Sequence, residues 1–221
     1  RSLATYPNSK VLEELLPLLQ DHRPEVRREC ATAIGRLGDS AAVAALLDAL
    51  EQSVDRTEEH SLIYALIEIN DPPTTRRGLQ QASPRVQQGS LIALDQMDAG
   101  DLQVEEVMPL ALSRDANLQR AAAEIFLEHP EWQPQAAQLL GPLLQRSKGM
   151  PLEHATTQRL LAQFVEQPQV RALVGRHLND PALSASTRSL ILHALAARQK
   201  IDFDPSWQPW ILPLSTRNCR I

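Results

Sequence analysis

The chain repeats one helical pattern six times, and this periodicity limits its fold more than any other feature of the sequence. The residues 4, 7, 8 and 11 positions after Val26 are Cys30, Ala33, Ile34 and Leu37. This spacing places all five side chains on one face of an α-helix. We call such a row of side chains a stripe and its first residue, here Val26, the stripe origin. Equivalent stripes, 28–39 residues apart, have their origins at Glu58, Val86, Leu118, Thr157 and Thr187. Six copies at such intervals indicate a repeat protein.

A second set of apolar segments lies between the stripes, and each pairs with the next stripe across a short polar turn. These segments are Val11–Leu19, Val43–Leu50, Thr74–Gln80, Val104–Leu112, Ala136–Leu144 and Val170–Leu178. No window sustains the period-two alternation of a strand. A helix pair of about 30 residues cannot bury its apolar face alone, so neighbouring pairs must stack. The pattern predicts an all-α, right-handed α-solenoid of about six helix pairs.

The same register predicts the domain organisation. We expect one solenoid over residues 8–199, and residues 200–221 begin a seventh unit or form a C-terminal cap. The predicted repeats are 8–39, 40–71, 72–99, 100–130, 131–167 and 168–199.

The composition excludes several classes of protein. The 221 residues are 43% hydrophobic, which argues against wholesale disorder. The 22 Lys+Arg against 27 Asp+Glu leave a net charge of −5, whereas a dedicated nucleic-acid binder is usually basic. No apolar run approaches the roughly 18 residues of a membrane-spanning helix. We therefore expect neither a nucleic-acid partner nor membrane insertion by this segment.

One stretch carries a family resemblance. Pro24–Arg28, Ala31–Asp39, Ala42-Val43 and Leu46-Leu47 resemble a HEAT repeat of the short bacterial type, and later repeats match less closely. The resemblance implies HEAT-like helix pairs and a scaffold that binds another protein or another domain of its parent chain. It also implies a structural ladder, in which side chains one position after the stripe origins reach acidic turn residues such as Asp21, Asp55 and Asp115. The ladder positions include Arg27, Gln87, Gln119 and Arg188.

A narrower resemblance concerns His60–Ile69, Leu91–Met97 and His129–Trp132. These segments are similar to the HEAT segment of planctomycete-type proteins that join a membrane-bound-dehydrogenase-like propeller to a c-type haem domain. That resemblance implies an extracytoplasmic location, and without it we expect a cytoplasmic one. The chain opens at Arg1 without an initiator Met, so we expect it to be a fragment of a larger protein.

The candidate binding residues lie two positions after each origin, roughly opposite the apolar stripe. If the repeats stack in register, they form a row on one surface. This row suits a mildly basic groove for an acidic peptide or for phosphate-bearing ligands held by arginines. The alternative is ordinary solvated helix surface. The candidates are Arg28, His60, Gln88, Arg120 and Arg159.

No motif predicts catalysis, a metal site or a cofactor. The sequence holds no HExxH, P-loop, GxGxxG or GxSxG, and its six histidines include no i,i+4 pair. We interpret carboxylate pairs such as Glu58-Glu59 as groups on helix surfaces or in first helical turns, where they serve solubility and the helix dipole. The leading hypothesis is a non-catalytic interaction scaffold. The alternative is a ligand- or DNA-acting HEAT-like protein, similar to alkylpurine glycosylases or bilin lyases.

Overall fold

The computed structural model describes residues 8–53, 55–146 and 151–197, and every regular element in these ranges is an α- or 3-10 helix. The all-α fold predicted from the periodicity is therefore confirmed. The elements are α1 (Asn8–Leu15), η1 (Leu16–Gln20), α2 (Pro24–Leu37), η2 (Ser40–Ala42), α3 (Val43–Gln52), α4 (Arg56–Ile69), α5 (Pro72–Thr75), η3 (Arg76–Gln80), α6 (Pro84–Gln96), α7 (Val104–Ala111), α8 (Ala116–Glu128), η4 (Pro130–Gln135), α9 (Ala136–Arg146), α10 (Pro151–Phe164), α11 (Pro168–Leu178) and α12 (Ala185–Ala196).

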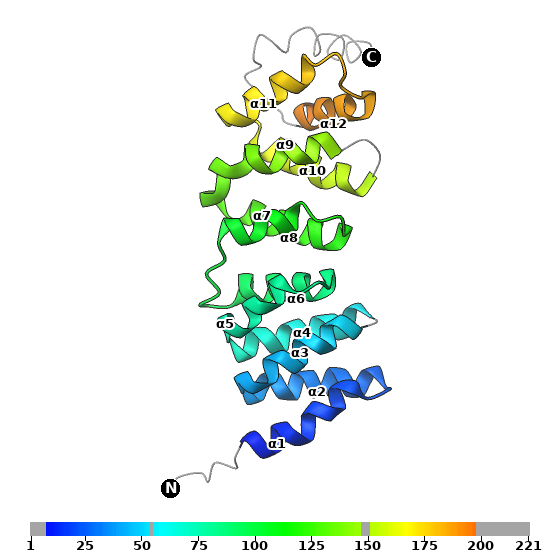
Figure 1. Ribbon diagram of the computed structural model, residues 1–221, viewed down its shortest axis with the longest axis vertical. Helices are drawn as coiled ribbons and strands as arrows, with labels where there is room; N and C mark the ends of the chain where they lie inside the picture. The colour runs from blue at the N-terminus through cyan, green and yellow to red at the C-terminus, as the bar shows by residue number, and fades with distance from the viewer. Residues whose placement is uncertain (1–7, 54, 147–150, 198–221) are drawn as a thin grey trace, which may run out of the picture. The chain divides into compact units, whose positions relative to one another are not determined.

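The helices alternate between the two sets that the pattern predicts (Figure 1). The apolar stripes fall on α2, α4, α6, α8, α10 and α12, which we call the stripe helices. The intervening segments form the first helix of each pair. The six repeat boundaries and the handedness of the solenoid stay predictions, and residues 200–221 lie outside the described residues.

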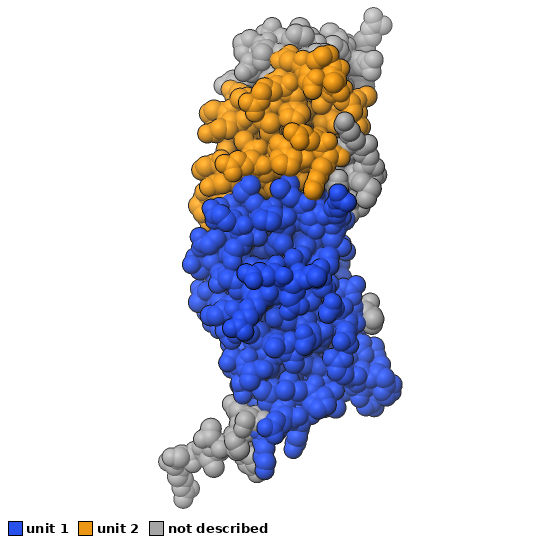
Figure 2. Space-filling model, in the orientation of Figure 1, with its two compact units in different colours: residues 1–125 blue, residues 126–221 orange. Residues whose placement is uncertain are grey.

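The chain divides into two compact units, residues 1–125 and 126–221 (Figure 2), and α8 includes residues of both ranges. In the first unit α2 packs against α4 and α4 against α6, while α3 contacts both α4 and α6. Ile34, Leu46, Leu62 and Leu91 are fully buried in its core. The stripes that start at Glu58 and Val86 are buried throughout and the Val26 stripe in part, because a 3.6-residue period keeps one face towards the neighbouring helices.

The second unit has an aromatic centre. The Phe126 ring is fully buried and packs edge-on against Phe164, with ring centroids 5.7 Å apart. It also contacts Trp132 at 6.0 Å, and Trp132 in turn stacks on His129 at 3.9 Å. Trp132 is thus buried as a packing residue of this aromatic cluster. Trp207 and Trp210 lie outside the described residues.

Proline, glycine, asparagine and aspartate residues mark the helix ends. Pro24 and Pro84 stand at the first position of α2 and α6, where a missing N–H costs nothing. Gly38 (φ 66°) ends α2 and Asn70 (φ 52°) ends α4, both in the left-handed region. The Asp55 carboxylate caps α4 by accepting the backbone N–H groups of Thr57 and Glu58, each at 2.8 Å.

The third pair departs from the sequence expectation, because its first helix is not a continuous α-helix over Thr74–Gln80. The segment is split into the four-residue α5 and the 3-10 helix η3. A Cβ at Gly78 of η3 would meet the side chains of Ser90 in α6 and Leu47 in α3. The tight approach of η3 to α6 therefore requires glycine at this position.

Candidate functional site

Arg27 joins two stripe helices through a buried ion pair. Its Nε donates to Glu58 Oε1 at 2.5 Å and its Nη2 donates to Glu58 Oε2 at 2.7 Å. A third donor, Nη1, reaches the Asp21 carbonyl at 2.7 Å. The Arg27 and Glu58 side chains are only 14% and 3% exposed, and the carboxylate raises the pKa of the guanidinium. One side chain thus ties α2 to α4 and to the turn before α2.

Glu58 lies in the first turn of α4, but its interpretation as a group that serves solubility and the helix dipole is wrong, because its side chain is buried. Glu58 occupies the first position of its apolar stripe, so the packing of α4 on α2 buries it beside Arg27. Glu59, one position further round the helix, is only partly buried and accepts a hydrogen bond from Gln88 Nε2 at 3.3 Å. The presence of a carboxylate at an apolar stripe position is the sequence feature that could have indicated this buried pair.

The other ladder positions make different contacts. Gln87 donates to the Leu79 carbonyl at 3.2 Å, which ties α6 to η3. Gln119 is buried, and no partner is found for its Nε2 among the described residues. Arg188 is half-buried in α12 and takes part in an interaction within the chain. The structure therefore joins Arg27, Asp21 and Glu58 in one cluster and leaves the other ladder residues outside it.

A second arginine, Arg76, also links two elements through several hydrogen bonds, but it does not stand at a ladder position. Arg76 in η3 donates to Glu106 Oε1 at 2.8 Å and to the carbonyls of Gly100 and Asp101 at 2.7 and 2.9 Å. Arg76 thereby links η3 both to the loop that precedes α7 and to the first turn of α7. No spacing rule predicts it, because Arg76 belongs to the first helix of its pair.

The Asp21 side chain pairs with Arg23 rather than with Arg27. Its carboxylate accepts from the Arg23 backbone N–H at 2.8 Å and from Nε and Nη2 at 3.0 and 3.2 Å. The Arg23 side chain, followed by its backbone N–H, lowers the pKa of Asp21 to about 2.

We expect Asp21 to titrate with a midpoint near 2 in a carboxyl-detected NMR titration. The folded-state pKa is depressed, so this contribution to stability is present above the unfolded-state value and is lost as the pH falls through about 2. Arg23→Gln should raise the midpoint towards about 3.9, the ordinary Asp value. The rise should be incomplete, because the backbone N–H of residue 23 still donates. A midpoint unchanged by Arg23→Gln would contradict this assignment.

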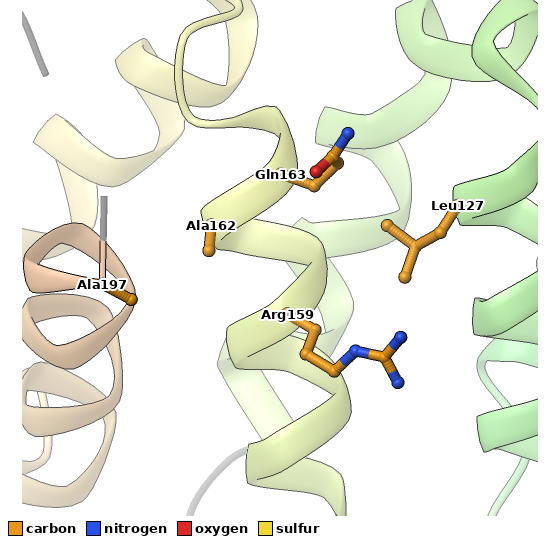
Figure 3. A pocket seen from close by; sticks show the side chains of 5 residues that line it. All are labelled: Leu127, Arg159, Ala162, Gln163 and Ala197. Atoms are coloured by element: carbon orange, nitrogen blue, oxygen red, sulfur yellow. The ribbon is translucent and has the colours of Figure 1, made fainter. Parts of the chain in front are cut away.

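The structure places the candidate binding residues in three different surroundings. Arg28 is half-buried and lies 3.9 Å from both Glu25 and Asp55. Arg159 belongs to the second unit, where it lines a small pocket of about 440 Å³ with Leu127, Ala162, Gln163 and Ala197 (Figure 3). His60, Gln88 and Arg120 do come together, because all three line one groove in the first unit.

This groove, which we call the α4–α6–α8 groove, has a volume of about 740 Å³ and follows the exposed sides of three successive stripe helices. Its charged groups are four carboxylates and three guanidinium groups. The balance is therefore mixed, not the mildly basic one that the row suggested. The charged lining residues are Asp55, Glu59, Asp115, Glu124, Arg56, Arg85 and Arg120.

An apolar patch lies beside these charges. Tyr64 is 50% exposed, and it shares the groove with the partly buried Ile67 and Ile92. Tyr64 and Ile92 stand six positions after their stripe origins, four beyond the candidate row and therefore one helical turn further along the same face. The candidate row does not include this patch, because the row contains only residues two positions after each origin.

No group of three or more His, Cys, Asp and Glu side chains that could hold a metal ion is found in the part of the chain that the structure describes. In the same residues no helix is both long and apolar enough to cross a bilayer.

The packed helix pairs define the class of protein: an all-α, HEAT-like repeat fold. The family model described as HEAT repeats matches residues 1–67. This match contains Arg27, Glu58 and the first part of the α4–α6–α8 groove, and it supports a HEAT-repeat family for the chain. A search of curated proteins finds no match.

Proposed function

We propose that the chain is a non-catalytic HEAT-repeat scaffold that binds another protein, or another domain of its parent protein, through the α4–α6–α8 groove. The observation that carries the proposal is the half-exposed Tyr64 beside Ile67 and Ile92, surrounded by charged groups. Protein interfaces characteristically combine a central aromatic or aliphatic anchor with a polar rim. HEAT repeats typically supply such extended surfaces by stacking rigid helices.

The charge balance also favours this function over the DNA-acting alternative. A protein that binds a phosphate backbone neutralises several phosphates with Lys and Arg. The α4–α6–α8 groove presents as many carboxylates as cations, counting His60 when protonated. Salt-dependent binding to a DNA duplex would favour the glycosylase-like alternative, and a bound tetrapyrrole would favour the bilin-lyase-like one.

The narrower resemblance concerns the protein around this chain. It proposes a parent with a propeller on one side and a c-type haem domain on the other. The full-length reading frame tests it: a CxxCH motif downstream would support this parent, and its absence would contradict it.

Photocrosslinking tests the binding site. A benzoylphenylalanine at position 64 should crosslink to a distinct protein or domain, and the same probe at the exposed Arg77 of η3, outside the groove, should not. With the identified partner purified, Tyr64→Ala should weaken binding about tenfold or more, or about 1.4 kcal/mol. Equal crosslinking from both positions, or an unchanged affinity for Tyr64→Ala, would count against this site.

A further inference from the structure

The carboxylates of the α4–α6–α8 groove are already engaged within the chain. Asp55 accepts the backbone N–H groups of Thr57 and Glu58. The Glu58 N–H, together with the Thr57 N–H and the nearby Arg28, holds the pKa of Asp55 below its ordinary value. Asp115 likewise accepts from the N–H groups of Asn117 and Leu118, each at 3.0 Å. At these helix N-termini the positive end of the helix dipole offsets part of each negative charge.

The two remaining carboxylates are also occupied. Glu59 accepts the amide of Gln88 at 3.3 Å, and Glu124 takes part in an interaction within the chain. Each of the four acidic groups therefore already has at least one interaction within the chain.

Most cationic groups of the groove, by contrast, have no partner among the described residues. Arg85 donates to the Ser53 carbonyl. Arg56, His60 and Arg120, by contrast, are exposed and form no hydrogen bond or ion pair with any other described residue. These three groups line the same groove as the Tyr64 patch. The charged groups of the groove that have no partner among the described residues are therefore positive, although the sum of its charged groups is nearly neutral.

We infer that the α4–α6–α8 groove binds a peptide segment of a partner protein that carries acidic side chains beside one large apolar side chain. This inference rests on the proposed function and specifies the partner's chemistry. The carboxylates of the segment pair with Arg56, His60 and Arg120, and the apolar side chain packs on Tyr64, Ile67 and Ile92. Arginine suits this role because its planar fork can hold a carboxylate through two parallel hydrogen bonds.

A display library of random twelve-residue peptides tests this inference on the purified chain. Peptides enriched on the wild type should be rich in Asp and Glu and should contain a large apolar residue. A synthetic copy of an enriched peptide, followed by fluorescence anisotropy, should bind the Arg56→Glu/Arg120→Glu variant at least about tenfold more weakly. Its binding to the wild type should also weaken as salt screens the charges.

The matched control is Arg77→Glu, which reverses the charge of an exposed arginine in the same unit outside the groove. Its affinity for the peptide should equal that of the wild type. All three replaced arginines are exposed, so each variant should melt within a few degrees of the wild type by circular dichroism.

The possible outcomes separate the inference from the proposed function. Peptides that depend on Tyr64 but not on Arg56 and Arg120 would leave the groove as a binding site and overturn the acidic specificity. Enrichment without an acidic bias would overturn it as well. If no groove-dependent peptide is enriched, both the proposed function and the inference are wrong. A mixed-sequence single-stranded DNA that displaces the peptide at physiological salt would identify a nucleic-acid site instead.

Discussion

Replacing Glu58 with alanine is expected to lower the free energy of unfolding by about 3–5 kcal/mol. The Glu58 side chain is 3% exposed and neutralises Arg27, which is itself 14% exposed. Without the carboxylate, the guanidinium keeps its contact with the Asp21 carbonyl but loses its counter-charge in a poorly solvated site. Removing one member of a buried pair costs more than the pair itself contributes, because a charge is left uncompensated. Urea denaturation, followed by far-ultraviolet circular dichroism, measures the loss.

Two further variants show whether the uncompensated charge is the cause. Glu59→Ala removes the neighbouring carboxylate, which is only partly buried, and should cost less than about 1 kcal/mol. The double variant Arg27→Leu/Glu58→Leu removes both charges and should recover most of the loss, since apolar replacements of buried pairs are often neutral. If Glu58→Ala lowers the free energy of unfolding no more than Glu59→Ala does, the Arg27–Glu58 pair does not hold α2 against α4.

Replacing Phe126 with alanine should destabilise the second unit by about 3–5 kcal/mol. Phe126 is fully buried, and it contacts both Phe164 at 5.7 Å and Trp132 at 6.0 Å. Truncation removes a large apolar area from the core and leaves a cavity that the two remaining rings cannot fill. The change in tryptophan fluorescence during urea denaturation, compared with that of the wild type, reports the loss.

The exposed aromatic residue of the first unit provides the control for Phe126. Tyr64→Ala deletes a ring that is 50% exposed, so its cost in stability should stay below about 1 kcal/mol. A similar loss for the two variants would mean that the aromatic cluster contributes little to the packing of the second unit.

The helices themselves could be predicted from the sequence because their signals are local. The 3.6-residue period of the Val26 stripe and the left-handed caps at Gly38 and Asn70 depend only on residues a few positions apart. The η3 segment could not be predicted, since its conformation depends on the approach of Ser90 and Leu47 to Gly78. Both residues are at least 12 positions away in the chain.

The candidate site could be predicted only in part. A spacing of two residues from each origin found His60, Gln88 and Arg120, which do line one groove. The same rule also selected Arg28, which lies near Glu25 and Asp55. It selected Arg159 as well, which lines a different pocket. Sequence position indicates which way a side chain leaves its own helix, but not which carboxylate it meets.

The all-α fold of paired helices could be predicted from the sequence, because helical periodicity and capping act within single segments. The choice of Glu58, and not the Asp21 side chain, as the counter-ion of Arg27 depends on tertiary packing. The capping by Asp55 and Asp115 is local, whereas the packed structure leaves Arg56 and Arg120 without a hydrogen bond or ion pair to any other described residue. The pairing of Arg27 with Glu58 depends on the register in which helices about 30 residues apart pack together. That register is a property of the assembled core rather than of any one repeat.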